Sequence, residues 1–192
     1  MTGNPTDLTA CAKQEIRALR RRSEDRSELA SAAQPNGPAW FVTEFGASSD
    51  PTLLATLTAE MDTQQVGWCY WSWMYYADPT GSAAESLLMA DGRLRSTARV
   101  LSRAYPQAIA GIPISFSFSP SSDVFRLSYV PNHRIKAPTV VFVPTQVHYP
   151  HGYCATSQGA RVTSAAGSEL LELRNDRTGH RVTVSVTPGR CT

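Results

Sequence analysis

The sequence predicts an α/β segment followed by an all-β sandwich, and two observations carry this prediction. An apolar strand pattern, a helical stripe and a second strand pattern follow one another within residues 40–73, which is typical of a βαβ unit. From Ile114 onward apolar residues instead alternate with polar ones between proline, asparagine and glycine turns, which is typical of an antiparallel sandwich. We therefore place one domain at 1–110 and a second at 113–192.

The amino-acid composition limits the classes of protein to which this chain can belong. The 192 residues are 42% hydrophobic and 18% charged, which is enough apolar material for a globular core. The net charge of +2 gives no reason to expect nucleic acid or an anionic membrane as a partner. No tract predicts a transmembrane segment, because prolines interrupt the uncharged run at 104–122. The first residues show no signal peptide, which predicts a cytoplasmic location for the chain as given.

The N-terminal forty residues predict one helix and one loop. Apolar residues recur at helical spacing between Leu8 and Arg22, so we expect an amphipathic helix there. The three arginines at 20–22 could form a nucleic-acid patch, but they are more typical of a solvated helix end that offsets the helix dipole. Residues 23–38 mix charges with serine, proline and glycine and predict a loop without an evident role.

The first strand pattern, at 40–46, places a carboxylate where the strand should end. Trp40, Phe41, Val42 and Phe45 favour a buried strand, and Glu44 stands two residues before the terminal glycine. In a parallel α/β barrel a residue at the C-terminal end of a strand faces the mouth of the active site. The simpler alternative is a glutamate that faces solvent.

A helix and an aromatic strand follow. Asp50 can cap a helix that runs to Gln65, and Pro51 suits its first turn. Its apolar stripe consists of Leu53, Leu54, Leu57 and Met61. Residues 66–73 then predict a second buried strand, in which we expect Trp68 and Tyr70 to be ordinary core residues. Because tryptophan faces bind sugar rings, a glutamate and a tryptophan at neighbouring strand ends suggest a site that cleaves sugars.

The chain after the second strand pattern changes character at a proline-rich boundary. Residues 75–93 predict an irregular segment, and residues 95–104 predict a helix that Pro106 ends. We draw the domain boundary across 106–113. Beyond it, the predicted short strands lie at 116–118, 125–129, 139–143, 169–174 and 182–186.

Four motifs together resemble a known family. They are Thr43–Gly46, Gly67–Trp73, Asp91–Arg93 and Ser102–Gly111, and an all-β tail follows them. In this order they resemble the last two barrel strands and the C-terminal sandwich of glycoside hydrolase family 5, most closely its endoglycoceramidase-like and cellulase-like actinobacterial members. The resemblance covers about residues 40–191. It implies a partial (β/α)8 TIM-barrel fragment followed by an antiparallel β-sandwich.

The resemblance also implies an activity and its residues. It implies a retaining glycosidase without a cofactor, which hydrolyses O-glycosidic bonds of β-glucans or glycosphingolipids outside the cell. Glu44 would be the catalytic nucleophile, and Trp71 would form the aromatic platform under the sugar. Trp73, Tyr75 and Tyr76 would contact the substrate at the rim.

The sequence departs from the family in its second catalytic carboxylate. In the family the acid/base is the glutamate of an Asn-Glu pair at the end of the fourth barrel strand, and this sequence contains no Asn-Glu pair. Asp50, Asp78 and Glu85 could approach Glu44, but no pattern marks any of them as the acid. With two barrel strands out of eight, the chain resembles the C-terminal third of an enzyme.

Two functions of different classes remain open at this point. The chain could be a glycoside hydrolase fragment that holds the nucleophile. It could instead be a non-catalytic remnant whose β-sandwich acts as a carbohydrate- or lipid-associated binding module. A coding region for an Asn-Glu-bearing half directly upstream would favour the first function.

The cysteines suggest one disulfide. Cys154 and Cys191 both fall in the sandwich region, and a bridge between them would tie down the last strand. His148 and His151 lie near Cys154, so a zinc site is an alternative, but the missing second pair of close cysteines argues against a metal. Cys69 is expected to be a buried thiol. A disulfide favours an oxidising compartment, which conflicts with the missing signal peptide.

Overall fold

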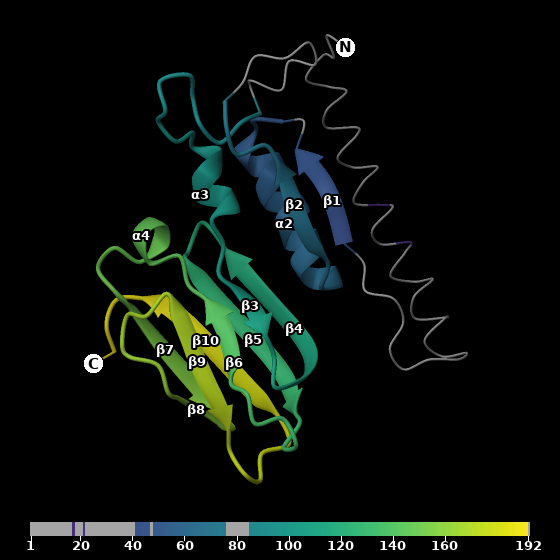
Figure 1. Cartoon of the computed structure of the whole chain (residues 1–192), viewed down its shortest axis with the longest axis vertical. Coiled ribbons are helices and arrows are strands. Elements are labelled where there is room, and N and C mark those ends of the chain that lie inside the picture. The colour runs from purple at the N-terminus through teal and green to yellow at the C-terminus, as the bar shows by residue number, and fades with distance from the viewer. Residues whose placement is uncertain (1–16, 18–20, 22–40, 47, 76–84, 192) are drawn as a thin grey trace. The chain divides into compact units, whose positions relative to one another are not determined.

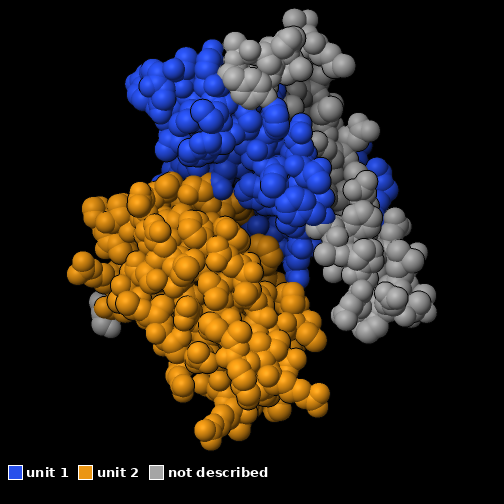
Figure 2. Space-filling model, viewed as in Figure 1, with its two compact units in different colours: residues 1–101 blue, residues 102–192 orange. Residues whose placement is uncertain are grey.

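The computed structural model describes two compact units, which are divided between Leu101 and Ser102 (Figure 2). The described residues are 17, 21, 41–46, 48–75 and 85–191. Most of the predicted helix at 8–22, the predicted loop at 23–38, and the residues Tyr76 and Asp78 lie outside them. No helix within the described ranges is long and apolar enough to cross a membrane.

Unit 1, which ends at Leu101, contains the predicted βαβ arrangement. Strand β1 (Phe41–Gly46) pairs in parallel with β2 (Gly67–Trp71), and helix α2 (Pro51–Gln64) connects them (Figure 1). The helix begins where the sequence predicts, because the Asp50 carboxylate accepts a 2.8 Å hydrogen bond from the Thr52 backbone N–H. The predicted helix and both predicted strands are thus confirmed, with ends that shift by one or two residues.

The core of unit 1 lies between the parallel strands and the helices. Leu54, Leu57 and Met61 of α2 are buried together with Phe45 of β1. The short helix α3 (Thr97–Leu101) adds two further buried side chains, Val100 and Leu101. One face of the strand pair is therefore covered by helices.

Unit 2, which begins at Ser102, consists of two four-stranded antiparallel sheets (Figure 1). One sheet has the order β4-β5-β10-β7 and the other β3-β6-β9-β8. The strands are β3 (Tyr105–Ala108), β4 (Gly111–Ser119), β5 (Val124–Pro131), β6 (Thr139–Phe142), β7 (Tyr153–Gln158), β8 (Ala160–Val162), β9 (Leu170–Asn175) and β10 (Val182–Pro188), and a single helical turn, α4 (Thr145–His148), follows β6. The predicted antiparallel sandwich is present.

The period-two pattern of the sequence builds the core of unit 2. Every second residue of β10, namely Val182, Val184 and Val186, is buried, and the same alternation buries Phe125, Leu127 and Tyr129 of β5. The opposite sheet contributes Val141, Leu171 and Leu173 to the same cluster. One contiguous core between the two sheets therefore holds this unit together.

Three strands of the sandwich were not predicted from the sequence. β3 contains Pro106, β8 has only three residues, and β7 lacks a clear alternation of apolar side chains. β3 also affects the domain boundary, because Tyr105 and Pro106 pair with Phe142 and Val141 of β6. Residues 102–110, which the sequence assigned to the first domain, therefore belong to unit 2. The helix predicted at 95–104 is shorter, since only α3 forms.

Candidate active site

Strand β1 carries one more residue than β2 at the position of Glu44. Val42 lies opposite Trp68, and Phe45 lies opposite Tyr70. Thr43 and Glu44 together thus face the single residue Cys69. An extra residue of this kind bends the strand and re-aims its side chains, and such irregularities are common beside active sites.

The two faces of the β1–β2 pair differ in character. On the helix-covered face, the Phe45 ring makes edge contacts with Trp68 at 5.2 Å and Tyr70 at 5.5 Å between centroids. The expectation that Trp68 and Tyr70 are core residues is confirmed, since both pack against the unit 1 core. Glu44 and Trp71, each one residue away from this face, are exposed on the other.

The exposed face brings the predicted nucleophile and the predicted platform to the same region. Trp71 is paired with Gly46, two residues beyond Glu44 along β1, and its side chain is 41% exposed. Strand spacing and residue rise place the two Cα atoms roughly 8 Å apart. A carboxylate and an aromatic side chain thus share one face at the C-terminal ends of neighbouring parallel strands.

Cys69 is not buried, contrary to the sequence-based expectation. It lies between Trp68 and Tyr70 in β2, and alternation sends its side chain to the opposite, exposed face. The prediction was wrong because an all-apolar strand pattern does not reveal which of its two faces is covered.

The segment after β2 presents further aromatic side chains. Trp73 is 60% exposed, and Tyr75 is also exposed. Ser72, between Trp71 and Trp73, is buried and follows a cis peptide bond, and its carbonyl oxygen accepts a 3.0 Å hydrogen bond from the Leu87 N–H. The backbone beneath the exposed aromatics is thereby attached to the segment that begins at Glu85.

The hydroxyl of Tyr70 supports the same end of the sheet, a role that the sequence did not reveal. It donates a 2.5 Å hydrogen bond to the Glu85 carbonyl oxygen and lies 3.4 Å from the Ser48 carbonyl oxygen. Burial, reinforced by the charge of Glu85 and opposed by that of Arg95, raises the pKa of Tyr70 to about 12. A neutral phenol therefore links the segments that follow β1 and β2.

The structure gives Asp50 a different role from that of a catalytic acid. Its Oδ1 accepts from the Thr52 and Leu53 N–H groups at 2.8 and 3.4 Å, which makes it the cap of α2. Asp78 lies outside the described residues. Within the described ranges, no side chain forms a hydrogen bond or ion pair with the Glu44 carboxylate.

The cysteines of unit 2 and the buried His148 take part in separate interactions. Cys154 and Cys191 form a disulfide in the structure. The buried His148 Nδ1 lies 2.6 Å from Asp123 Oδ1. Among the described residues, no group of three or more metal-ligating side chains comes together. The Cys154 sulfur is bonded to Cys191 and is therefore not free to serve as the zinc ligand of that alternative.

Comparison with known proteins places this arrangement in context. Residues 103–186 match the family model described as the glycoside hydrolase family 5 C-terminal domain. Endoglycoceramidase I of Rhodococcus hoagii is 36% identical over 149 residues, which are 77% of this chain and 27% of the relative. The chain thus spans little more than a quarter of that relative's length.

Solved structures support the same fold. Endo-glycoceramidase II from a Rhodococcus species, solved in complex with ganglioside GM3, superposes with a TM-score of 0.67 at 23% identity, over 89% of this chain and 36% of that one. Sterylglucosidase 1 of Cryptococcus neoformans superposes with a TM-score of 0.63 at 15% identity, over 77% of this chain and 28% of that one. Residues 103–186 are therefore a glycoside hydrolase family 5 C-terminal domain, and the chain as a whole is similar to the C-terminal portion of endoglycoceramidases.

Proposed function

We propose that this chain supplies the nucleophile side of a retaining glycoside hydrolase site, with Glu44 as the nucleophile. The position of Glu44 carries the proposal. It lies at the extra residue near the C-terminal end of β1, on the exposed face that also presents Trp71. The likeness to endoglycoceramidases supports the same assignment. In this proposal β1 and β2 are two strands of a (β/α)8 barrel, and their exposed face is turned toward its interior.

The chemistry requires a partner for Glu44. In a retaining glycosidase the carboxylate attacks the anomeric carbon and forms a covalent glycosyl ester, while a second carboxylic acid about 5–5.5 Å away protonates the departing oxygen. That second group then removes a proton from the water that hydrolyses the ester. The 192 residues contain no Asn-Glu pair to supply it. We therefore propose that the chain by itself is inactive.

Trp71, Trp73 and Tyr75 would bind the substrate in this proposal. Their exposed rings are suited to contact with the apolar faces of sugar rings at the end of the sheet where Glu44 lies. The names of the relatives favour glycosphingolipids over β-glucans as the substrate, since both Rhodococcus proteins are endoglycoceramidases and endo-glycoceramidase II was solved with a ganglioside.

The disulfide supports a proposal on location. Bridges such as Cys154–Cys191 persist in oxidising compartments and are rare in the cytosol. We therefore propose that the folded protein resides outside the reducing cytosol, as the family resemblance implies.

A chimeric enzyme tests the role of Glu44. The chain would replace the matching C-terminal segment of endoglycoceramidase I from Rhodococcus hoagii, so that the rest of the relative supplies the remaining strands. We expect the chimera to hydrolyse an aryl glycoside and Glu44→Gln to abolish turnover. Glu60→Gln, which changes a carboxylate on α2, serves as the control and should leave turnover intact.

The chimera also separates the two open functions. Undiminished turnover in the Glu44→Gln chimera would show that another residue is the nucleophile. A folded chimera without any activity, as judged by circular dichroism and assay, would favour the non-catalytic binding module instead.

A further inference from the structure

The net charge of +2 conceals a strong separation of charge between the two units. Residues 102–192 contain nine lysines and arginines against four aspartates and glutamates, a net charge of +5. Residues 1–101 contain nine basic and twelve acidic residues, a net charge of −3. The sandwich is therefore a cationic unit in a nearly neutral chain, and the position of its charges determines what it can attract.

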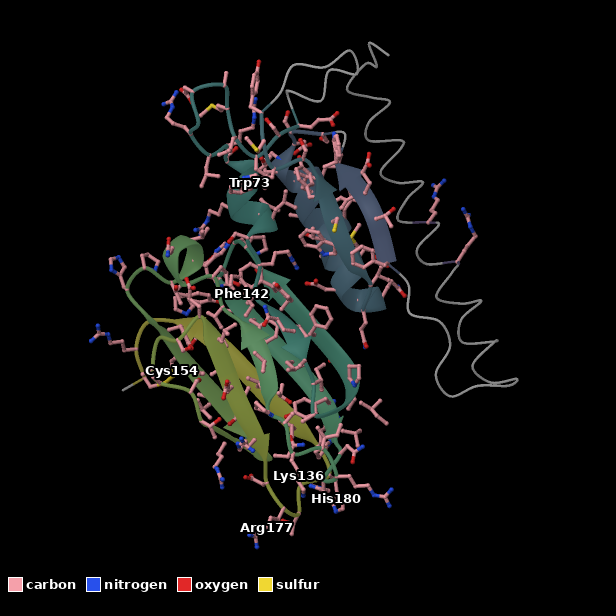
Figure 3. The ribbon with its side chains drawn as sticks, in the orientation of Figure 1. Trp73, Lys136, Phe142, Cys154, Arg177 and His180 are labelled. Atoms are coloured by element: carbon pink, nitrogen blue, oxygen red, sulfur yellow. A yellow bond between two sulfur atoms is a disulfide. The ribbon has the colours of Figure 1, made fainter. Side chains whose placement is uncertain are left out.

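Most of these cations gather at one end of the sandwich, where three connections meet. His133, in the β5–β6 connection, has its Nε2 atom 3.1 Å from the Gly179 carbonyl oxygen in the β9–β10 connection. Gly179 in turn packs against the backbone of Gly159, between β7 and β8. The cations at this end are Arg134, Lys136, Arg161, Arg174, Arg177 and Arg181, and we call them the basic end. Figure 3 shows Lys136, Arg177 and His180 grouped there.

Two arginines of the basic end face each other directly. Arg161 of β8 lies opposite Arg174 of β9 in the antiparallel register, and both are exposed. Like charges in this position destabilise a sheet. Arg174 donates a 2.9 Å hydrogen bond to the Lys136 carbonyl oxygen, and it forms no ion pair with a carboxylate in the described part of the chain. Neither the Arg161 nor the Arg177 side chain forms a hydrogen bond or ion pair with another described residue.

These side chains line a surface hollow of about 700 Å³. Four permanent cations border it, namely Lys136, Arg161, Arg174 and Arg177, together with His133 and Ile135. Asp176 is the only carboxylate in this lining, so the hollow keeps a net charge of +3. A concave site with several unpaired arginines is suited to phosphate or carboxylate groups, because the guanidinium fork binds both in a bidentate manner.

An apolar side chain at the basic end distinguishes between possible anionic partners. Ile135 stands between Arg134 and Lys136 and is 40% exposed. Nucleic acids and sulfated glycans offer charge but no apolar interior to receive such a side chain. The interface of a lipid bilayer offers both, since basic residues bind its anionic headgroups while neighbouring apolar side chains enter the acyl boundary.

The basic end is also remote from the connection to unit 1. The chain enters the sandwich through β3, whose first residue, Tyr105, pairs with Phe142 at the end of β6. The basic end lies at the other end of β6, beside Thr139.

We propose that the basic end docks the protein on anionic phospholipid bilayers, with the arginines on headgroup phosphates or carboxylates and Ile135 in the interface. This proposal is independent of hydrolysis, because it concerns unit 2 alone.

Vesicle co-sedimentation of the full chain tests the proposal. Vesicles of phosphatidylcholine with phosphatidylserine are compared with vesicles of pure phosphatidylcholine, both free of glycolipid. We expect binding only to the anionic vesicles. Binding should weaken at high salt, because the Debye length falls from about 10 Å at 0.1 M to about 3 Å at 1 M.

Two variants with equal net charge locate the binding surface. Arg161→Gln/Arg177→Gln removes two cations of the basic end, neither of which holds another described residue in place. Arg126→Gln/Arg190→Gln removes two exposed cations elsewhere in unit 2. Because each basic residue near an anionic membrane contributes about fivefold in affinity, we expect the first variant to bind at least tenfold more weakly. The second should bind like the unaltered chain, and equal weakening of both variants would overturn the proposal.

The Ile135→Ser variant and immobilised heparin decide between a membrane and a general polyanion. We expect Ile135→Ser to weaken vesicle binding and to leave heparin retention unchanged. If Ile135→Ser leaves vesicle binding unchanged while Arg161→Gln/Arg177→Gln loses heparin retention, the surface is a polyanion site and the membrane proposal is wrong.

Discussion

Tyr129 of β5 and Asn175 of β9 connect the two sheets of unit 2 through a 2.7 Å hydrogen bond from the phenol hydroxyl to the amide oxygen. The bond belongs to a closed circuit. The Asn175 amide donates to the Ala110 carbonyl oxygen at 2.8 Å, the Ala110 N–H donates to Thr139 Oγ1 at 2.9 Å, and Thr139 donates to the Tyr129 hydroxyl at 3.0 Å. Each buried polar group of the circuit thus has a partner.

Removing the Tyr129 hydroxyl should destabilise the sandwich. Tyr129→Phe removes the acceptor of the buried Thr139 hydroxyl and the donor to the Asn175 amide oxygen, and we expect a loss of about 1–3 kcal/mol in the free energy of unfolding. Urea denaturation followed by circular dichroism measures this loss. Tyr105→Phe, at an exposed position of β3, is the control and should change stability little. Equal stability of the two variants would mean that the circuit contributes nothing.

Stability should fall in alkali because of buried tyrosines. Burial raises the pKa of Tyr129 and of Tyr153, and burial together with the charge of Asp123 raises that of Tyr149. Tyr70 has its pKa raised from 10.0 to about 12. The unfolded chain therefore loses these protons at lower pH than the folded chain, so the stabilisation is complete below pH 10 and is lost as the pH rises above it.

Denaturation at a series of pH values, with phenolate absorbance recorded in parallel, checks the alkaline effect. We expect the free energy of unfolding to decline between pH 10 and about 12. The Tyr70→Phe variant should show a smaller decline, because it lacks one of the titrating phenols. Phenolate absorbance of the folded protein that follows free tyrosine throughout would contradict the expectation.

The disulfide should contribute substantially to the stability of unit 2. Cys154 and Cys191 are 37 residues apart, and on the chain-entropy model a loop of this length is worth about 4 kcal/mol. We expect Cys154→Ala/Cys191→Ala to lower the urea midpoint of unit 2 markedly. Cys69→Ser, which alters an exposed free thiol, should not lower it. A midpoint insensitive to the double substitution would argue that the bridge adds no net stability.

The start of the foldable sandwich should lie near Ser102. The buried Arg103 donates a 3.1 Å hydrogen bond to the Phe118 carbonyl oxygen and places its guanidinium 5.3 Å from the Phe118 ring centroid. We expect a chain that begins at Ser102 to unfold cooperatively. One that begins at Ile112 loses β3, Arg103 and the Ala110 hydrogen bonds, so it should be less stable or unfolded. Thermal denaturation of the two truncated chains compares them, and indistinguishable curves would contradict this boundary.

The whole chain should not turn over glycosides by itself. Glu44 has no general acid beside it among the described residues, and loss of acid–base assistance typically costs about 10²–10⁴-fold in rate. An assay on an activated aryl glycoside should give the same background for the chain and for Glu44→Gln. Turnover that this single substitution abolishes would falsify the proposal that the site is incomplete.

The sequence alone determined those features that local patterns encode. The cap at Asp50 and the stripe of leucines predicted α2, and strict alternation predicted β5 and β10, because the period of the apolar residues follows directly from helix and strand geometry. The resemblance added Glu44 and Trp71 as site residues. The predictions of the helix and the strands depend on residues that are close together in the chain, and the assignment of the two site residues depends on short motifs.

Tertiary structure decided which face of a strand is covered and which distant residues meet. Strand register places Cys69 on the exposed face and sets Thr43 and Glu44 opposite it, and neither strand pattern indicates this pairing. The partners of Tyr129 come from 46 and 10 residues away, and the cations of the basic end come from two connections and from strands β8 and β9. Such contacts depend on how separate strands pair and pack, and no local period carries that information.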